Sequence, residues 1–225
     1  MANYYTDRNL KAFKDARNAF RVQIENGKRI VVSISHGNSK MGEIPSVSLL
    51  PYITCPFKCA DCYAAKIAAL YPTVRNAYAR NTALAQEDLA EYMRQVENAA
   101  KMTRFFRWHV SGDITTAAYF AEMVRIAENL PHTDFLAFTK RYSIVNKYLD
   151  AHGGKLPANL HIIFSKWDGV EMDNPYNLPV AVVVRPGNDP APEWKVCGGN
   201  CFECACRGVG CWELKDGETI AFNLH

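Results

Sequence analysis

The sequence lacks a long apolar run and carries little net charge for its 225 residues. No uncharged stretch approaches the roughly 20 residues that a helix needs to cross a bilayer. The amino terminus also lacks the apolar core of a signal peptide. The formal net charge of +3 is too small to indicate a nucleic-acid or anionic-membrane partner. We therefore expect a cytoplasmic protein without a membrane partner.

A disulfide framework is also absent from the pattern. The chain has eight cysteines, but they fall into two tight groups instead of being spread along it, as they are in small secreted proteins. With 48% hydrophobic residues, the chain can bury the core of one sizeable domain and is not expected to be disordered. The clustering of the cysteines favours metal binding.

The first group is a short loop with the spacing C-x3-C-x2-C, formed by Cys55, Cys59 and Cys62, directly after an apolar extended run over residues 47–54. Three thiolates at this spacing can bind three irons of a cubane cluster and leave the fourth iron open to a small molecule. The alternative is a structural zinc site, which needs four ligands. No fourth ligand is evident near this loop.

In spacing and position, this loop resembles the cluster motif of the radical S-adenosylmethionine (radical SAM) superfamily, which follows the first strand of a partial α/β barrel. The resemblance implies that Cys55, Cys59 and Cys62 bind a [4Fe-4S] cluster whose open iron takes S-adenosylmethionine (SAM). It also implies reductive cleavage of SAM to a 5′-deoxyadenosyl radical, which abstracts hydrogen from a substrate, and an electron donor such as flavodoxin or ferredoxin. Family members usually have an aromatic residue before the third cysteine. Here Asp61 stands there and Tyr63 follows, so Tyr63 is the candidate cofactor contact.

Hydrophobic periodicity predicts an amphipathic helix over residues 9–24 and an amino-terminal hairpin made by residues 29–35 and 47–53. Helices are expected over residues 63–70 and, with possible breaks, 75–102. Strands and helices then alternate, which indicates parallel pairing. The predicted strands are 105–110, 135–138, 160–164, 180–184 and 220–222, and the intervening helices are 117–129 and 143–151.

Six strands are available when residues 47–53 are counted, which matches the open six-stranded barrel of radical SAM enzymes. The expected fold is therefore α/β, a partial (βα)6 TIM-like barrel with a C-terminal cysteine-rich cluster-binding segment. We assign residues 1–44 to an N-terminal helix and hairpin extension and residues 45–190 to the barrel. Residues 191–225 form the cysteine-rich segment with a last short strand.

Parallel barrels gather their functional groups at the carboxyl ends of their strands. After the strand over residues 105–110 come Ser111, Gly112 and Asp113, which resemble the glycine-glycine-glutamate segment of radical SAM enzymes. The resemblance implies that this segment holds the ammonium group of SAM. The alternative is a turn in which Asp113 caps the next helix. His109, inside the apolar strand, is expected to be a hydrogen-bonded histidine that points inward.

Three further strand ends carry hydroxyl groups or cations. Thr139 and Lys140 are candidate contacts of the SAM carboxylate or the substrate, and by resemblance Ser165 is a candidate ribose contact. Arg185 could pair bidentately with a carboxylate or phosphate. Its alternative role is in a surface turn set by the proline and glycine that follow it.

The second cysteine group places five thiols within fifteen residues: Cys197, Cys201, Cys204, Cys206 and Cys211. The first three repeat the C-x3-C-x2-C spacing, and one of the other two completes a four-thiolate site. We take Cys211 as the fourth ligand and Cys206 as the alternative. A second [4Fe-4S] cluster and a zinc knuckle that folds this glycine-rich segment both fit the pattern.

Residues 37–43, the end of the cysteine loop at Cys62-Tyr63-Ala64, the Ser-Gly-Asp segment and the final Cys211-Trp212 also resemble a phage family called gene product eighty-eight. The resemblance covers most of the chain after about residue 30 and names no reaction. We expect a radical SAM enzyme that acts on a nucleotide, a nucleic acid or a peptide. The competing hypotheses are a zinc-stabilised nucleic-acid-binding protein and a two-cluster electron-transfer protein.

Overall fold

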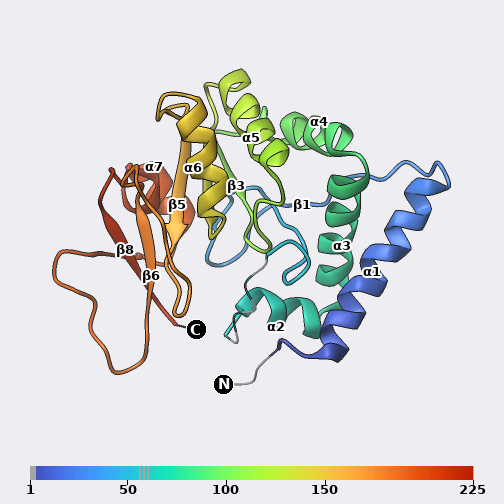
Figure 1. The fold of residues 1–225 in the computed structure, drawn as a ribbon, viewed down its shortest axis with the longest axis horizontal. Helices are drawn as coiled ribbons and strands as arrows, with labels where there is room; N and C mark the ends of the chain where they lie inside the picture. Colours follow the sequence, from blue (N-terminus) through green and yellow to red (C-terminus); the bar gives the residue numbers. More distant parts are fainter. Residues whose placement is uncertain (1–3, 56, 58, 60, 225) are drawn as a thin grey trace.

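A mostly parallel sheet organises the molecule (Figure 1). The computed structural model describes residues 4–224 except residues 56, 58 and 60. In this part of the chain the sheet has eight strands in the order β1-β2-β3-β4-β5-β6-β8-β7. β1 and β2 are antiparallel, and every other neighbouring pair is parallel. The bounds are β1 (Ile34–Ser35), β2 (Ser46–Val47), β3 (Phe105–Trp108), β4 (Asp134–Thr139), β5 (Leu160–Ser165), β6 (Val180–Val184), β7 (Lys195–Val196) and β8 (Thr219–Asn223).

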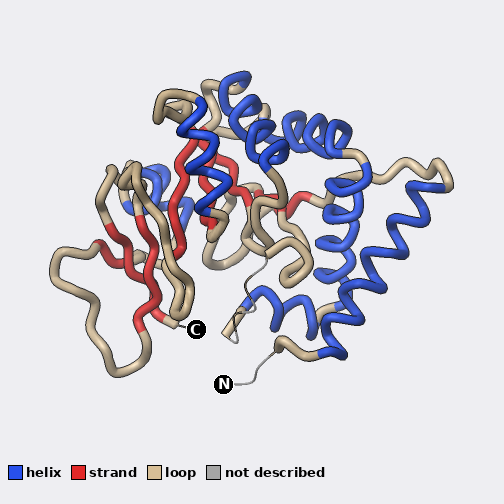
Figure 2. Tube along the Cα trace, in the orientation of Figure 1, coloured by secondary structure: helices blue, strands red, loops and turns tan. Residues whose placement is uncertain are grey.

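Most of the helices form an arc on one side of the strands, whereas the short helix over residues 201–207 lies on the other side (Figure 1 and Figure 2). They are α1 (Asp7–Glu25), α2 (Tyr63–Leu70), α3 (Pro72–Glu87), α4 (Leu89–Ala100), α5 (Ala117–Asn129), α6 (Tyr142–Ala151) and α7 (Cys201–Arg207), with a 3-10 turn at Gly210–Trp212. α1 lies along α3 (Figure 1). Within residues 4–224, apart from 56, 58 and 60, no helix combines the length and apolarity that a bilayer crossing requires.

The predicted mixed α/β architecture with parallel strands is confirmed, and so are the helices over residues 9–24, 63–70, 117–129 and 143–151. The long helical stretch over residues 75–102 is two helices, because the chain breaks at Asp88. The Asp88 side chain accepts a 2.9 Å hydrogen bond from the Glu91 amide and so caps α4. The predicted amino-terminal hairpin is also confirmed, since β1 and β2 pair antiparallel.

The two strands of that hairpin are shorter than predicted. Before β1, helix side chains replace strand partners: Val32 N–H donates to Gln95 Oε1 at 2.8 Å, and Ser33 N–H donates to Asn81 Oδ1 at 2.7 Å. After β2, the chain turns before the cysteine loop, and Tyr52 takes a positive φ of 62°. The apolar run over residues 47–53 is therefore buried largely as irregular chain. The sequence analysis did not predict β7 or α7.

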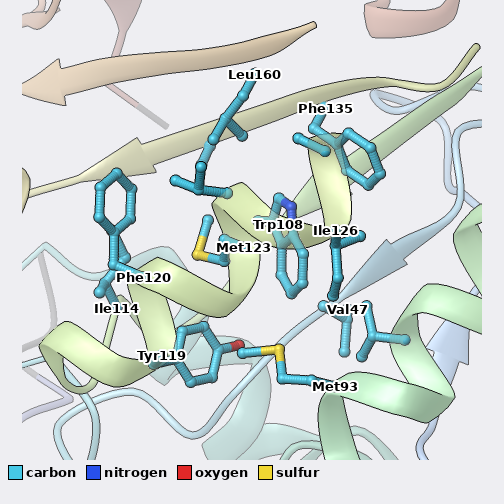
Figure 3. Packing of buried hydrophobic residues seen from close by; sticks show 14 of the residues in the cluster. Val47, Met93, Trp108, Ile114, Tyr119, Phe120, Met123, Ile126, Phe135 and Leu160 are labelled. Atoms are coloured by element: carbon cyan, nitrogen blue, oxygen red, sulfur yellow. The ribbon is translucent and has the colours of Figure 1, made fainter. Parts of the chain in front are cut away.

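One face of the sheet packs against α4, α5 and α6. Figure 3 shows Trp108 of β3 and Phe135 of β4 close to Ile126 and Met123 of α5. All four side chains are fully buried. Burying each such side chain contributes about 1.5–3 kcal/mol, so this layer is a main source of stability.

The opposite face of the sheet carries the alternate residues of the same strands. They pack against the C-terminal segment, where Trp212 lies 5.3 Å from Phe105 between ring centroids. Ala205 of α7 belongs to the same apolar cluster. The strand residues in this cluster are Phe105, Leu136, Ile163, Ala181 and Ile220. The segment with the second cysteine group therefore covers the face of the sheet that α4, α5 and α6 do not cover.

Candidate functional site

A cavity of about 560 Å³ lies at the carboxyl ends of β3, β4 and β5, within the size range of small-molecule and cofactor sites. Its wall joins the cysteine loop to segments distant in sequence. Among the predicted site residues outside the second cysteine group, every one except Arg185 borders it: Cys55, Cys59, Cys62, Tyr63, Ser111, Gly112, Asp113, Thr139, Lys140 and Ser165. The geometry thus brings the loop and three strand ends to one site.

The three cysteines of the loop all border this cavity. Burial raises the pKa of Cys55 to about 12 and also raises the pKa of Cys59 and of Cys62, while the nearby charge of Lys140 lowers all three. The Tyr52 hydroxyl donates to the Cys59 carbonyl at 3.2 Å and so helps to hold the loop. Binding of a metal by these thiols therefore releases protons.

The donor set of the loop is three thiols. In the described part of the chain, no three His, Cys, Asp or Glu side chains are arranged around one metal position. Cys55, Cys59 and Cys62 all border the cavity. Three protein thiolates are one fewer than the four ligands of a structural zinc site, and on a cubane they would leave one iron without a protein ligand.

The Asp113 carboxylate joins the ends of β3 and β4. Its Oδ1 accepts from Thr139 Oγ1 at 2.6 Å and its Oδ2 accepts from Lys140 N–H at 3.0 Å, although burial raises the pKa of Asp113. The alternative that Asp113 caps the next helix is wrong, because Thr116 caps α5. The Thr139 hydroxyl also accepts from Arg141 N–H at 2.9 Å. It therefore acts both as a donor and as an acceptor within the protein.

Ser111 and Gly112 dock this strand end onto the chain that leads into the cysteine loop. Ser111 Oγ donates to the Leu49 carbonyl at 2.9 Å. Gly112 has a φ of 81°, and a Cβ there would lie 2.6 Å from Thr54 Oγ1 and 2.7 Å from Leu49 Cβ. Only glycine fits this position, because both the backbone conformation and the space exclude a side chain.

Of the other three predicted contacts, two line the cavity and one does not. Tyr63 begins α2 at the cavity wall, and Ser165 lies at the end of β5. Arg185 does not line the cavity. It lies 2.7 Å from Asp168 and 3.5 Å from Asp61, which does line the cavity, so Arg185 touches the site only through that carboxylate.

His109 begins a buried hydrogen-bonded chain beside the cavity. Its Nε2 lies 2.9 Å from the Tyr119 hydroxyl, which lies 3.0 Å from the Tyr92 hydroxyl. His109 has a positive φ of 52°, and its Nδ1 has no hydrogen-bond partner among the described residues. Burial lowers the pKa of His109 to about 3, so the ring stays neutral. The expectation of a hydrogen-bonded histidine is confirmed.

The second cysteine group lies on the face of the sheet opposite α4, α5 and α6. Cys201, Cys204 and Cys211 pack beside the apolar cluster there, whereas Cys206 is exposed. Burial raises the pKa of Cys211 to about 12, with a contribution from the neighbouring sulfurs of Cys197, Cys201 and Cys204. Four thiols are therefore neighbours, and Cys206 lies outside their group.

Arg107 is the site residue that the sequence analysis missed most clearly. It lines the cavity, and its Nη1 also reaches the Cys201 sulfur at 3.6 Å. The available signal was a lone charged residue in the apolar strand β3, two positions before His109. Tyr52 and Trp167 also line the cavity, and no local pattern marked them.

Comparisons with known proteins give one result. The model of the family described as Gene product 88 matches residues 9–216 of the chain. No curated protein and no solved structure matches it. None of these comparisons supports the resemblance to the radical SAM superfamily, which therefore depends on the residues of the chain itself.

Proposed function

The chain belongs to the gene product 88 family, and we propose that it is a radical SAM enzyme that abstracts hydrogen from a small substrate in the 560 Å³ cavity. One observation carries the proposal. The three-cysteine loop and the polar ends of β3, β4 and β5 border the same cavity, although they are separated by up to about 110 residues in sequence. A structural metal site needs no such ligand-sized space beside it.

In this proposal Cys55, Cys59 and Cys62 hold a [4Fe-4S] cluster. When bound, the cluster supplies the electron that cleaves SAM, and SAM supplies the 5′-deoxyadenosyl radical that takes hydrogen from the substrate. A flavodoxin or ferredoxin serves as the electron donor. The protein contributes ligands, orientation and protection from water.

Four polar or aromatic groups of the cavity wall orient SAM. Lys140 pairs with its carboxylate. Asp113 Oδ1 already accepts from Thr139 and the Ile114 amide. Its Oδ2, which among the described residues accepts only from the Lys140 amide, therefore accepts from the ammonium group. Ser165 contacts the ribose and Tyr63 the adenine. The backbone of Gly112 contacts the same ammonium group.

The strand order supports a more specific architecture. We propose that β2, β3, β4, β5, β6 and β8, which are successive parallel neighbours, form a partial TIM-like barrel that stays open. The C-terminal segment then closes the inner face, and Cys197, Cys201, Cys204 and Cys211 hold a second [4Fe-4S] cluster. The Arg107 contact with Cys201 puts this second group next to the cavity wall.

The competing hypotheses do not use these features. A structural zinc site takes four ligands, one more than the cysteine loop provides, and an electron-transfer protein requires no cavity lined with polar strand ends. Nucleotides, nucleic acids and peptides remain the proposed substrate classes.

The test is anaerobic reconstitution with iron and sulfide, followed by measurement of bound iron, bound sulfide and SAM affinity by equilibrium dialysis. The variant in which Cys55, Cys59 and Cys62 are all alanine should lose about half of the iron and all SAM binding. The matched control is Cys206→Ser, which should keep both. The proposal fails if SAM does not bind, or if it binds the triple variant as tightly as the wild type.

A further inference from the structure

The guanidinium of Arg107 lies at the cavity wall. Its Cζ lies 4.8 Å from the ring centroid of Phe138, and its Nη1 lies 3.2 Å from Met41 Sδ. Arg107, Phe138 and Met41 all line the cavity. The atoms that make these contacts belong to the guanidinium, so the charged end of the side chain is the part that borders the cavity.

This guanidinium has no anionic oxygen as a partner in the described residues. Its only recorded acceptors are the sulfurs of Met41 and Cys201, which are weak acceptors. The buried Nε has no partner, and Nη2 makes no hydrogen bond to a described residue. An arginine offers five N–H donors in a rigid fork. Only Nε of Arg107 is both buried and unpartnered, so Nη2 is the unpartnered nitrogen that a ligand can reach. Most of the donors of this guanidinium are therefore not engaged by the described residues.

The charges around the cavity favour an anionic ligand. Four cations line it: Lys40, Arg107, Lys140 and Lys166. Of the two carboxylates in the lining, Asp61 lies in an ion pair with Arg185, and Asp113 accepts hydrogen bonds from Thr139 and from the Lys140 amide. Lys140 lies beside the cysteine loop, whereas Arg107 lies beside the second cysteine group. The proposed function assigns Lys140 to the carboxylate of SAM, which leaves Arg107 as a cation that a second anion can meet at the other side of the cavity.

The second cysteine group offers a competing partner for Arg107. The charge of Arg107 lowers the pKa of Cys211, and its Nη1 reaches Cys201. These contacts use one nitrogen of the guanidinium. They leave Nη2 without a partner, and the sulfur at 3.6 Å is a distant acceptor. An oxyanion that enters the cavity can therefore bind Nη2, to which neither sulfur is hydrogen-bonded.

We propose that Arg107 is the centre of an oxyanion subsite in the cavity, which binds a carboxylate or phosphate group. The assignment of that group to the substrate rests on the proposed function and makes the substrate a small anionic molecule. The subsite itself requires neither cluster nor SAM. Arg107 binds the anion through Nη2, with its plane held by the ring of Phe138.

The experiment measures the thermal unfolding midpoint of the full chain in sodium phosphate and in sodium acetate, each against sodium chloride of equal ionic strength. A bound anion raises the midpoint by mass action. The variants are Arg107→Gln and Arg107→Lys. The matched control is Arg104→Gln, because Arg104 is exposed, lies over the Phe105 ring at 5.0 Å and does not line the cavity.

The wild type and the Arg104→Gln variant should show a saturable rise with phosphate or with acetate. Arg107→Gln should require an anion concentration at least about tenfold higher for the same rise, because a charge-assisted hydrogen bond is lost. A response to phosphate alone indicates a phosphorylated substrate, and a response to acetate alone indicates a carboxylic acid. Equal responses in the wild type and in Arg107→Gln would overturn the subsite.

A second readout needs no variant. Phenylglyoxal modification of Arg107 in the wild type, mapped by mass spectrometry, should be slowed by the active anion and not by chloride. Unchanged modification in both phosphate and acetate would overturn the proposal even if the Arg107 variants fail to fold. Neither readout involves SAM, so a protein that binds oxyanions at Arg107 but not SAM would refute the proposed function and retain the subsite.

Discussion

Replacing Gly112 with alanine should destabilise the protein more than the same change at an equally strained but open glycine. Gly112 has a φ of 81°, where a side chain costs about 1–2 kcal/mol. The added Cβ would also lie 2.6 Å from Thr54 Oγ1 and 2.7 Å from Leu49 Cβ. Overpacking of this kind costs about 1–3 kcal/mol, so the total loss should be about 2–5 kcal/mol.

Gly187 is the matched control. Its φ is 85°, and no heavy atom lies within 4 Å of an added Cβ. The Gly187→Ala variant should therefore lose only the conformational part, about 1–2 kcal/mol. Urea unfolding of both variants, with the slope m compared to that of the wild type, gives the two free energies of unfolding. If Gly112→Ala is no less stable than Gly187→Ala, the inference that Gly112 packs too closely against the segment before the cysteine loop to admit a side chain is refuted.

Three further predictions test the buried histidine and the two cysteine groups. Because the pKa of His109 falls from 6.5 to about 3 on folding, the unfolded chain takes up a proton first as the pH falls. The wild type should therefore lose about 2 kcal/mol of stability relative to His109→Gln between pH 7 and pH 5, and an unchanged difference in urea unfolding would contradict this. Cys206→Ser should keep the iron bound on reconstitution and Cys204→Ser should lose part of it, whereas equal iron contents in both would remove the assignment of Cys206 as the spare thiol. Lys140→Met should slow iodoacetamide alkylation of the loop thiols in the metal-free protein about three- to tenfold, since it removes a cation that lowers their pKa, and the exposed control Lys155→Met should not. Equal rates in the two lysine variants would show that this cation does not act on the thiols.

The sequence predicted the alternating part of the fold well, because each helix there shows a helical repeat of apolar residues and each strand is a short apolar run. The helix over residues 117–129 and the strand over residues 180–184 have the predicted bounds. The region before the cysteine loop was predicted less well. Its backbone is satisfied by Asn81 and Gln95, side chains of later helices, and a local pattern cannot report such distant partners.

The composition of the cavity wall was predicted largely from strand ends, since parallel strands bring their carboxyl ends to one edge. The roles of its members depend on contacts that sequence alone does not reveal. Asp113 joins two strands instead of capping a helix. Arg185 lies outside the cavity and pairs with Asp168 and with Asp61, which lines it. Arg107 was overlooked because its strand was interpreted as apolar core, whereas its position faces the cavity and the second cysteine group.

The central claim is that the loop thiols hold a cluster with an iron open to SAM. The most direct measurement is electron paramagnetic resonance of the reconstituted, reduced protein, recorded with and without SAM, with the alanine variant of Cys55, Cys59 and Cys62 beside it. We predict a cluster signal that changes on addition of SAM and whose SAM-sensitive part is absent from the variant. A signal that ignores SAM, or a protein that takes up zinc and no cluster, would contradict the account.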